Sequence, residues 1–194
     1  LATVDCLRTM GAKVDIDGNR VTVVGTLPDR AAGGVYPCRE SGSTLRFFIP
    51  VAMLSKQKSL FSGSKRLMDR PLNVYERISE EKNILFFRNN EGITVGCGLT
   101  SGEYEVPGNI SSQFITGLIF ALVYLGEDSS IEILPPFESR SYIDLTIYAL
   151  ASFGASVAFA DEYKIEIKAS KRKAFSGRIE GDYSNAAFLD SFNF

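Results

Sequence analysis

Two stretches of this sequence decide its fold, Gly108-Asn109-Ile110-Ser111-Ser112-Gln113-Phe114 and Arg39-Glu40-Ser41-Gly42-Ser43-Thr44-Leu45-Arg46. In each, a turn of small polar residues runs straight into an apolar segment of helical length, 115–125 after the first and 47–54 after the second. Such a turn favours a helix start, because a serine side chain accepts a hydrogen bond from a first-turn N–H. The N–H groups and the helix dipole then attract an anion. One such start is more often an ordinary cap, but two indicate a site for more than one anionic group.

The composition excludes several classes of function. The chain has 194 residues, of which 45% are hydrophobic, and a formal net charge of −2, which is enough for one sizeable core. We expect no nucleic-acid partner, because no basic face is evident. We expect no membrane span, because the longest apolar run, 114–125, is too short. The chain has no histidine, so proton transfer would use carboxylates, lysines or tyrosines.

The three cysteines, Cys6, Cys38 and Cys97, lie far apart in the sequence without paired spacing. We interpret them as reduced thiols of a cytoplasmic protein, with neither a zinc site nor a disulfide framework. The chain begins at Leu1 and ends at Phe194 within helix-like patterns, from which we expect a fragment.

The same order of elements recurs along the chain. Apolar periodicity predicts helices over 1–10, 43–54, 71–82, 111–125 and 142–153, and short strands over 14–16, 21–24, 35–38, 59–61, 84–87, 93–97, 103–106, 130–134, 157–159, 164–167 and 175–179. The capping serines, Ser43, Ser111 and Ser184, are 68 and 73 residues apart. This spacing indicates repeated β-α-β-α-β-β units, which must pack around a common centre.

The repeat places the chain in the α/β (α+β) class. We expect residues 1–181 to form one substrate-binding domain whose first unit is incomplete, and residues 182–194 to begin the crossover to a second domain. The segment 114–125 is apolar nearly all round, which predicts a fully buried helix.

Residues that bind anions precede the predicted helices. Arg66 and Arg70 lie in a basic loop, 62–70, before a helix that we expect to begin at Pro71. Ser139 and Tyr142 take the same place one unit later. Equivalent positions should share one side of the domain, which gives a face of Gly42, Ser43, Arg66, Ser111, Ser112, Gln113, Ser139 and Tyr142.

Arginine suits phosphate, and hydroxyls and backbone N–H groups add neutral donors. The pattern is about as typical of solvated loops and ordinary caps as of a phosphate site. Glu138 and Asp144 are the nearby carboxylates, and a loop charge and a helix-start charge are the more typical explanation for them.

Five ordered motifs, at residues 40–46, 66–71, 108–114, 139–144 and 180–184, together resemble the family of 5-enolpyruvylshikimate-3-phosphate synthases, also called 3-phosphoshikimate 1-carboxyvinyltransferases. The resemblance implies two domains, each an inside-out α/β barrel of three such units, with the active site between them. It implies transfer of the enolpyruvyl group from phosphoenolpyruvate to the 5-hydroxyl of shikimate 3-phosphate, in aromatic amino-acid biosynthesis. It implies no metal or cofactor, and glyphosate competes for the phosphoenolpyruvate position in this family.

The resemblance also implies roles for residues of this chain. Gly42 would let the backbone approach phosphoenolpyruvate, Arg66 would hold its phosphate, and Gln113 would lie between the two substrates. Arg46 and Arg70 match family positions but look like structural supports.

The resemblance implies a separate set of residues for shikimate 3-phosphate. The 3-phosphate would be held by Ser111, Ser112 and Ser139, and Tyr142 would line the ring. Glu40 and Phe47 depart from the commoner Asn and Pro of the family, which leaves inhibitor sensitivity open.

The family's proton-transfer residues come from outside the matched region. We therefore expect no catalytic residue in this chain and no turnover by the chain alone, the missing second domain being its partner. Two alternatives stay open, a UDP-N-acetylglucosamine enolpyruvyltransferase and a non-catalytic anion-binding module. The first is disfavoured because its reactive Cys is replaced here by Lys65, five residues before Arg70-Pro71.

Overall fold

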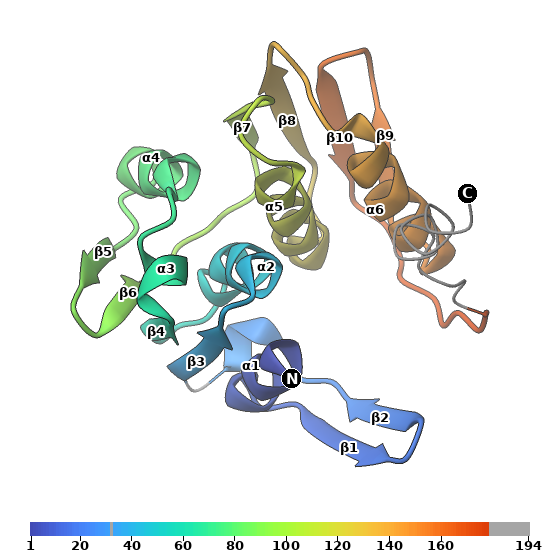
Figure 1. Cartoon of the computed structure of the whole chain (residues 1–194). Coiled ribbons are helices and arrows are strands. Elements are labelled where there is room, and N and C mark those ends of the chain that lie inside the picture. Colours follow the sequence, from blue (N-terminus) through green and yellow to red (C-terminus); the bar gives the residue numbers. More distant parts are fainter. Residues whose placement is uncertain (32, 179–194) are drawn as a thin grey trace, which may run out of the picture.

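The computed structural model describes residues 1–31 and 33–178 and contains two copies of one β-α-β-α-β-β unit (Figure 1). The middle unit consists of β3 (Gly34–Arg39), α2 (Gly42–Ala52), β4 (Ser59–Gly63), α4 (Asn73–Glu81), β5 (Phe86–Asn89) and β6 (Gly92–Val95). The last unit consists of β7 (Glu103–Pro107), α5 (Ser112–Leu125), β8 (Ser129–Leu134), α6 (Arg140–Ser152), β9 (Ser156–Phe159) and β10 (Lys164–Lys168). The predicted repeat is therefore confirmed in the described residues.

The two units build their sheets in the same way. The strand orders are β3-β4-β6-β5 and β7-β8-β10-β9. In each sheet the first two strands are parallel, joined through α2 or α5, and the remaining pairs are antiparallel. A parallel pair needs such a crossover helix, whereas the last two strands need only a hairpin.

The N-terminal part repeats only the second half of this unit. Helix α1 (Ala2–Met10) ends at Gly11, whose φ of 107° suits glycine, and leads into the hairpin β1 (Lys13–Asp17) and β2 (Arg20–Val24). The predicted hairpin turn at 17–19 is thus confirmed. A short 3-10 helix, Pro28–Arg30, lies in the loop before β3.

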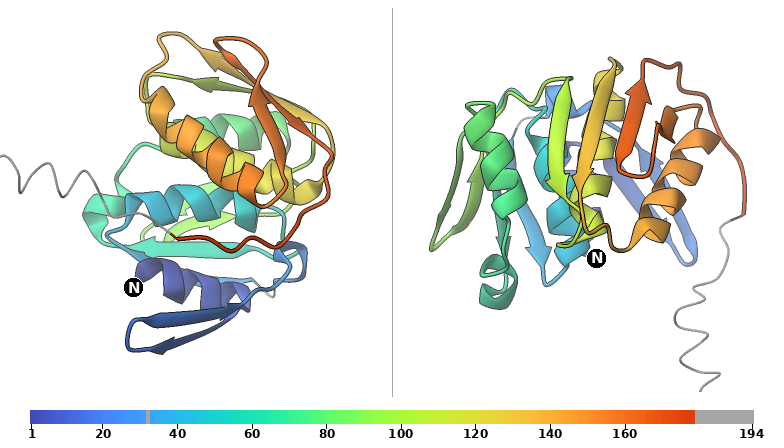
Figure 2. Two further views of the ribbon diagram at one scale, coloured as in Figure 1. Left: turned by 90° about the vertical axis from the view of Figure 1, so that its right-hand side faces the viewer. Right: turned by 90° about the horizontal axis from the view of Figure 1, so that it is seen from above.

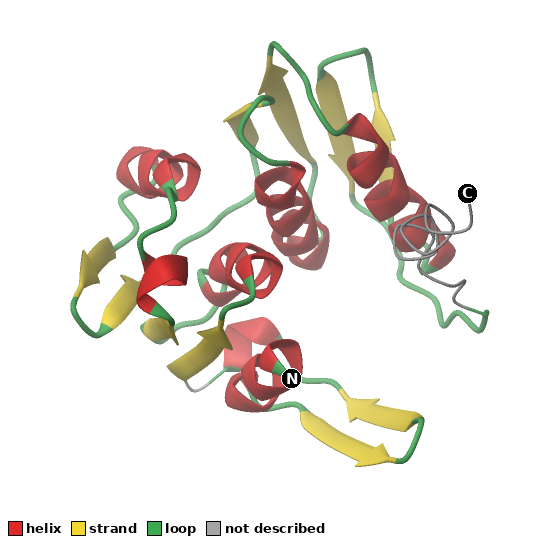
Figure 3. Cartoon of the chain, viewed as in Figure 1, coloured by secondary structure: helices red, strands yellow, loops and turns green. Residues whose placement is uncertain are grey.

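Helices α2 and α5 pack side by side at the centre, and the strands lie outside them (Figures 1 and 3). The two further views show the same arrangement (Figure 2). Gly117 allows this close packing, since a Cβ there would lie 2.5 Å from the Arg46 carbonyl oxygen. The buried Tyr75 hydroxyl of α4 lies 2.6 Å from the same oxygen and 3.2 Å from the Phe114 carbonyl, so it joins both helices.

Three predictions of secondary structure were wrong. The basic loop contains a short helix, α3 (Lys65–Met68). Ser64 is its N-cap residue, and the Ser64 hydroxyl accepts a hydrogen bond from the Leu67 N–H. Helix α4 begins at Asn73 rather than Pro71, with Leu72 as its N-cap. Residues 175–178 form no strand, since they pair with no strand in the described part of the chain, and Ile179 lies outside the described residues.

The helix at 114–125 is not fully buried as predicted. Most of α5 is inaccessible, but Phe120, Val123 and Tyr124 are half-buried. These three side chains line an apolar groove of about 530 Å³ together with residues of α1, α2 and α6. Within residues 1–31 and 33–178, no further helix covers this stripe of α5. Among the described residues no helix is both long and apolar enough to cross a bilayer.

Ser41, and not Ser43, caps α2. The Ser41 hydroxyl accepts from the Thr44 N–H at 3.3 Å, and Ser43 is already the second helical residue. The predicted position was wrong because both serines fit the pattern, and only the extended backbone of Ser41 (φ −82°, ψ 101°) aims its side chain at the helix. Ser111 caps α5 as predicted, and Ser184 lies outside the described residues.

Replacing Ser41 with alanine is expected to destabilise the protein by about 1 kcal/mol, the usual contribution of such a cap. In a chain of this size that corresponds to a Tm lower by about 2–4 °C. The matched control is Ser43→Ala, which should change the free energy of unfolding by less than about 0.5 kcal/mol. Thermal unfolding of both variants measures this, and a larger loss in Ser43→Ala would contradict the assignment of the cap.

Candidate functional site

A pocket of about 600 Å³ opens where α5 and α6 begin. Five of the predicted site residues line it, and they are Ser111, Ser112, Gln113, Ser139 and Tyr142. The other lining residues are Phe47, Ile110, Thr116, Phe120, Leu145, Thr146 and Ala149. None of these side chains carries a charge, so the pocket offers hydroxyl, amide and backbone donors on partly apolar walls.

Gly108 joins the two loops that carry these serines. Its N–H donates to the Leu134 carbonyl at 2.8 Å, and its own carbonyl accepts from the Glu138 N–H at 3.1 Å. A Cβ at this position would lie 2.8 Å from a methyl group of Ile133 and 2.9 Å from the backbone of Phe137. Only glycine therefore lets the turn before α5 lie against the loop before α6, which brings Ser111 near Ser139.

The serines at the two helix starts are held differently. The Ser111 side chain accepts from the Gln113 N–H at 3.3 Å in an N-cap. Ser139 is the N-cap residue of α6 in the left-handed conformation (φ 59°), and its hydroxyl makes no cap hydrogen bond. Its side chain lines the pocket instead. The Ser139 hydroxyl is thus placed to donate to a bound molecule.

The first charged residues of α6 pair with each other. The Arg140 guanidinium stacks over the Phe159 ring at 4.0 Å and lies 3.9 Å from the Asp144 carboxylate. Neither residue lines the pocket. This agrees with the structural role expected for Asp144.

Two threonines that the sequence reasoning missed hold α5 and α6 together behind the serines. The hydroxyls of Thr116 and Thr146 are 3.0 Å apart and buried, and the Thr146 hydroxyl donates to the Tyr142 carbonyl at 2.9 Å. Their signal in the sequence was a hydroxyl three or four residues after Gln113 and Tyr142, in otherwise apolar segments. Together they fix the spacing between the two sides of the pocket.

Arg46 of α2 holds Gln113. Its guanidinium donates to the Gln113 side-chain oxygen at 2.8 Å and lies 4.8 Å from the centre of the Phe114 ring. Burial, and then the nearby Arg70, lower the pKa of Arg46. Because the amide oxygen faces Arg46, the Gln113 NH₂ group is the donor end. Arg46 was expected to be a structural support, and the side chain that it supports is that of Gln113.

Arg66 and Gly42 lie beside this pocket rather than in it. A second hollow of about 110 Å³ is lined by Glu40, Ser64, Arg66, Leu67 and Arg70. A Cβ on Gly42 would lie 2.6 Å from an Arg70 nitrogen and 3.9 Å from Arg46. Gly42, at the start of α2, therefore lies between Arg70, which lines the second hollow, and Arg46, which binds Gln113.

The donors and cations form two adjoining groups. The larger pocket is uncharged and rich in hydroxyls, and the smaller hollow carries two guanidinium groups beside the first turn of α2. Such groups suit two separate anionic substituents, because each phosphate accepts hydrogen bonds from hydroxyl, backbone and guanidinium donors. In residues 1–31 and 33–178, no group of three or more metal-ligating His, Cys, Asp or Glu side chains occurs.

Known proteins match this chain along nearly its whole length. The family model of EPSP synthase (3-phosphoshikimate 1-carboxyvinyltransferase) matches residues 1–192. A 3-phosphoshikimate 1-carboxyvinyltransferase of Clostridium perfringens is 36% identical over 195 residues, covering 98% of this chain and 46% of that protein. The same-named protein of Clostridium kluyveri is 38% identical, covering 96% of this chain and 45% of that protein.

A solved structure shares the fold. The EPSP synthase from Acinetobacter baumannii superposes with a TM-score of 0.77 at 22% identity, over 97% of this chain and 43% of that one. This chain thus spans a little less than half the length of the relatives that it matches. The family resemblance predicted from the five motifs is confirmed. From the match over residues 1–192 and the relatives above 30% identity, the chain belongs to the EPSP synthase (3-phosphoshikimate 1-carboxyvinyltransferase) family.

Proposed function

We propose that the full-length protein containing this chain transfers the enolpyruvyl group of phosphoenolpyruvate to the 5-hydroxyl of shikimate 3-phosphate. The observation that carries the proposal is the convergence of Ser111, Ser112, Gln113, Ser139 and Tyr142 on one uncharged pocket at two helix starts. A sugar-like ring with a phosphate substituent needs such a set of donors, since hydroxyl and backbone N–H groups hold the phosphate and an aromatic side chain covers the ring.

The reaction would proceed by addition and then elimination. In the first step, the 5-oxygen of shikimate 3-phosphate loses its proton and bonds to C2 of phosphoenolpyruvate, while the methylene carbon gains a proton. In the second step, the new methyl group loses a proton and the C2–phosphate bond breaks. The products are 5-enolpyruvylshikimate 3-phosphate and inorganic phosphate, and neither step needs a cofactor.

This chain would bind and orient the substrates in that reaction. Ser111, Ser112 and Ser139 donate to the 3-phosphate, and Tyr142 lies along the ring. Gln113, held by Arg46, presents its NH₂ group between the two substrates. Correct orientation lowers the barrier because the reacting atoms no longer have to find each other in solution.

Phosphoenolpyruvate is assigned to the second hollow. Arg66 holds its phosphate, and Gly42 lets the first turn of α2 approach it without a side chain in the way. Arg70 lines this hollow and lies next to Gly42, so it adds to the positive potential there.

The acid and base of the reaction, and further cations, are assigned to the second domain of the full-length protein. We propose a cytoplasmic enzyme of two domains that close on two small-molecule substrates, without nucleic-acid or membrane partners. Residues 1–181 form the substrate-binding domain, and residues 182–194 begin the crossover. The chain alone is expected to show no turnover, and activity should return when the missing part is supplied.

The apolar groove supports the proposal that the first unit is incomplete. Both complete units supply a central apolar helix, α2 or α5, whereas α1 and its hairpin have no such companion in the described residues. The groove lies among α1, α2, α5 and α6, with Leu7, Val51 and Phe120 on its walls. We assign it to a third central helix of the same kind, supplied by the full-length protein. A full-length structure with this groove open to solvent would contradict the assignment.

Calorimetric titration of the chain separates the candidate functions. Shikimate 3-phosphate should bind weakly, and Ser139→Ala should reduce the affinity by about tenfold, as the loss of one hydrogen bond to a charged group requires. Ser152→Ala is the matched control at the other end of α6, and it should bind like the unchanged chain. Circular dichroism confirms that each variant is folded.

The outcomes assign the alternatives. Preferential binding of UDP-N-acetylglucosamine would favour the sister family of enolpyruvyltransferases. No heat from either ligand with a folded chain would favour a non-catalytic module. Equal loss in Ser139→Ala and Ser152→Ala would contradict the role of the pocket.

A further inference from the structure

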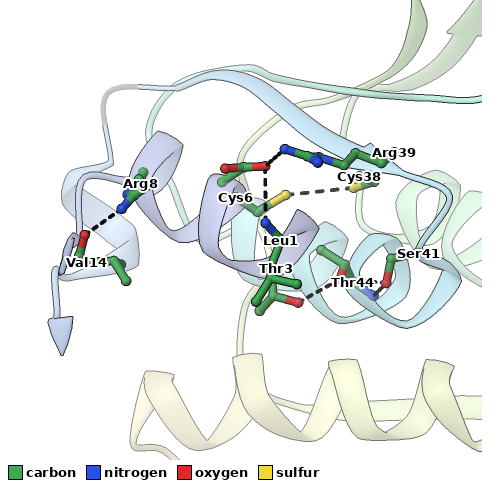
Figure 4. Close-up of polar contacts among 10 residues, drawn as sticks. Leu1, Thr3, Cys6, Arg8, Val14, Cys38, Arg39, Ser41 and Thr44 are labelled. Atoms are coloured by element: carbon green, nitrogen blue, oxygen red, sulfur yellow. Dashed lines mark hydrogen bonds and ion pairs between the residues drawn. The ribbon is translucent and has the colours of Figure 1, made fainter. Parts of the chain in front are cut away.

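Two cysteines that are 32 positions apart in the sequence meet in the fold. Cys6 on the inner side of α1 and Cys38 on β3 have their sulfur atoms 3.9 Å apart (Figure 4). Both side chains are completely buried, whereas Cys97 is exposed. All three are free thiols.

Polar contacts on both sides of the pair hold α1 against β3 and α2. The Arg39 guanidinium lies 2.5 Å from the Asp5 carboxylate, and the Thr9 hydroxyl donates to the Val35 carbonyl at 3.0 Å. The Thr3 hydroxyl lies 2.9 Å from that of Thr44 in α2 (Figure 4). These contacts keep the two sulfur atoms in van der Waals contact.

The hydrogen bond between the two thiols shifts the pKa values of the pair in opposite directions. When one thiol donates its hydrogen to the other sulfur, that hydrogen bond lowers the pKa of Cys6 and raises the pKa of Cys38. The thiolate is the reactive form, so the first proton of the pair leaves more readily than that of an isolated buried thiol. An S–S bond is about 2.05 Å long, so rotation of the two side chains must bring the sulfurs together.

We propose that Cys6 and Cys38 form an oxidisable dithiol that closes to an intrachain disulfide on exposure to hydrogen peroxide. Peroxide is small and uncharged, but both sulfurs are fully buried, so its access requires a local opening of α1. One thiolate attacks a peroxide oxygen, the O–O bond breaks, and a sulfenic acid and hydroxide form. The partner thiol then attacks the sulfenic sulfur, and its proton leaves with the hydroxyl group as water. The hydroxide takes up the proton that the first thiol released on becoming a thiolate, so two electrons pass from the dithiol to the peroxide and two waters result.

The disulfide would fasten α1 to the strand that leads into α2. Cys38 is three residues before Ser41, the N-cap residue of α2, and Thr44 joins that cap to Thr3 of α1. Closing a chain loop of this length restricts the unfolded state, so oxidation should raise Tm by about 5 °C or more. Oxidation thus acts on the support of the helix start next to the second hollow.

The test is peptide mapping of the full-length protein after mild peroxide treatment and alkylation. The expected result is a linked pair of tryptic peptides carrying Cys6 and Cys38, which dithiothreitol separates, with the higher Tm lost on reduction. Cys38→Ser should give no linked pair and no Tm rise, and Cys97→Ser should behave like the unchanged protein. Recovery of Cys6 and Cys38 as alkylated thiols would overturn the proposal, as would sulfinic acid on either residue without a link.

Discussion

Gly117→Ala is expected to destabilise the protein by about 2–3 kcal/mol, which lowers Tm by about 4–12 °C for a chain of this size. The added Cβ would lie 2.5 Å from the Arg46 carbonyl oxygen, 2.7 Å from the Tyr75 hydroxyl and 3.2 Å from Cα of Phe47. Two of these atoms belong to the backbone of α2, so relief requires a shift of the whole helix. Alanine favours the helix by about 1 kcal/mol relative to glycine, which is too little to offset the clash.

Urea and thermal unfolding measure this effect. Gly25→Ala is the matched control, because nothing lies within 4 Å of a Cβ at that position and its backbone is not left-handed. The control should unfold like the unchanged protein. If Gly117→Ala proved equally stable, α2 and α5 would have more room at their crossing than the structure gives them.

Arg66→Ala in the full-length enzyme is expected to reduce kcat/KM for phosphoenolpyruvate by about 10- to 150-fold. This loss corresponds to about 1.5–3 kcal/mol for a hydrogen bond to a charged group. The side chain is exposed, so its removal should leave Tm nearly unchanged. Steady-state kinetics with varied phosphoenolpyruvate, at saturating shikimate 3-phosphate, measure this kcat/KM.

Lys65→Ala controls for the loss of a positive charge in the same short helix. The Lys65 ammonium pairs with Asp69 at the surface and does not line the second hollow. It should change kcat/KM by less than about threefold, because exposed ion pairs contribute little. Unchanged phosphoenolpyruvate kinetics in Arg66→Ala would show that the assignment of Arg66 is wrong.

The repeat and the five predicted residues that line the pocket were accessible from sequence for different reasons. Apolar periodicity and turn residues act over a few positions, so the helices and most strands were predicted to within a few residues. Ser111, Ser112, Gln113, Ser139 and Tyr142 were found because small polar residues before apolar helices have a local signature. Their roles toward substrates remain predictions that the titrations and kinetics above will test.

Several local details escaped because competing solutions satisfy the same pattern. Ser41 and Ser43 are both good helix caps, and only the backbone angles of the folded turn select Ser41. Helix α3 was missed because four residues carry no periodicity. The stretch at 175–178 has strand propensity, but no strand among the described residues pairs with it.

The sequence by itself determined the order of the units, the helix starts and the polar residues placed before them, because hydrogen bonding and apolar spacing along a short segment decide these. Only the tertiary structure decided which segments meet. It brought Arg46 to Gln113 across the α2–α5 contact and Cys6 to Cys38 between α1 and β3. The close approach at Gly108 determined that Ser111 and Ser139, which the repeat had placed on one face, line a single pocket. Such contacts depend on how distant surfaces fit, and no local pattern in one chain encodes that fit.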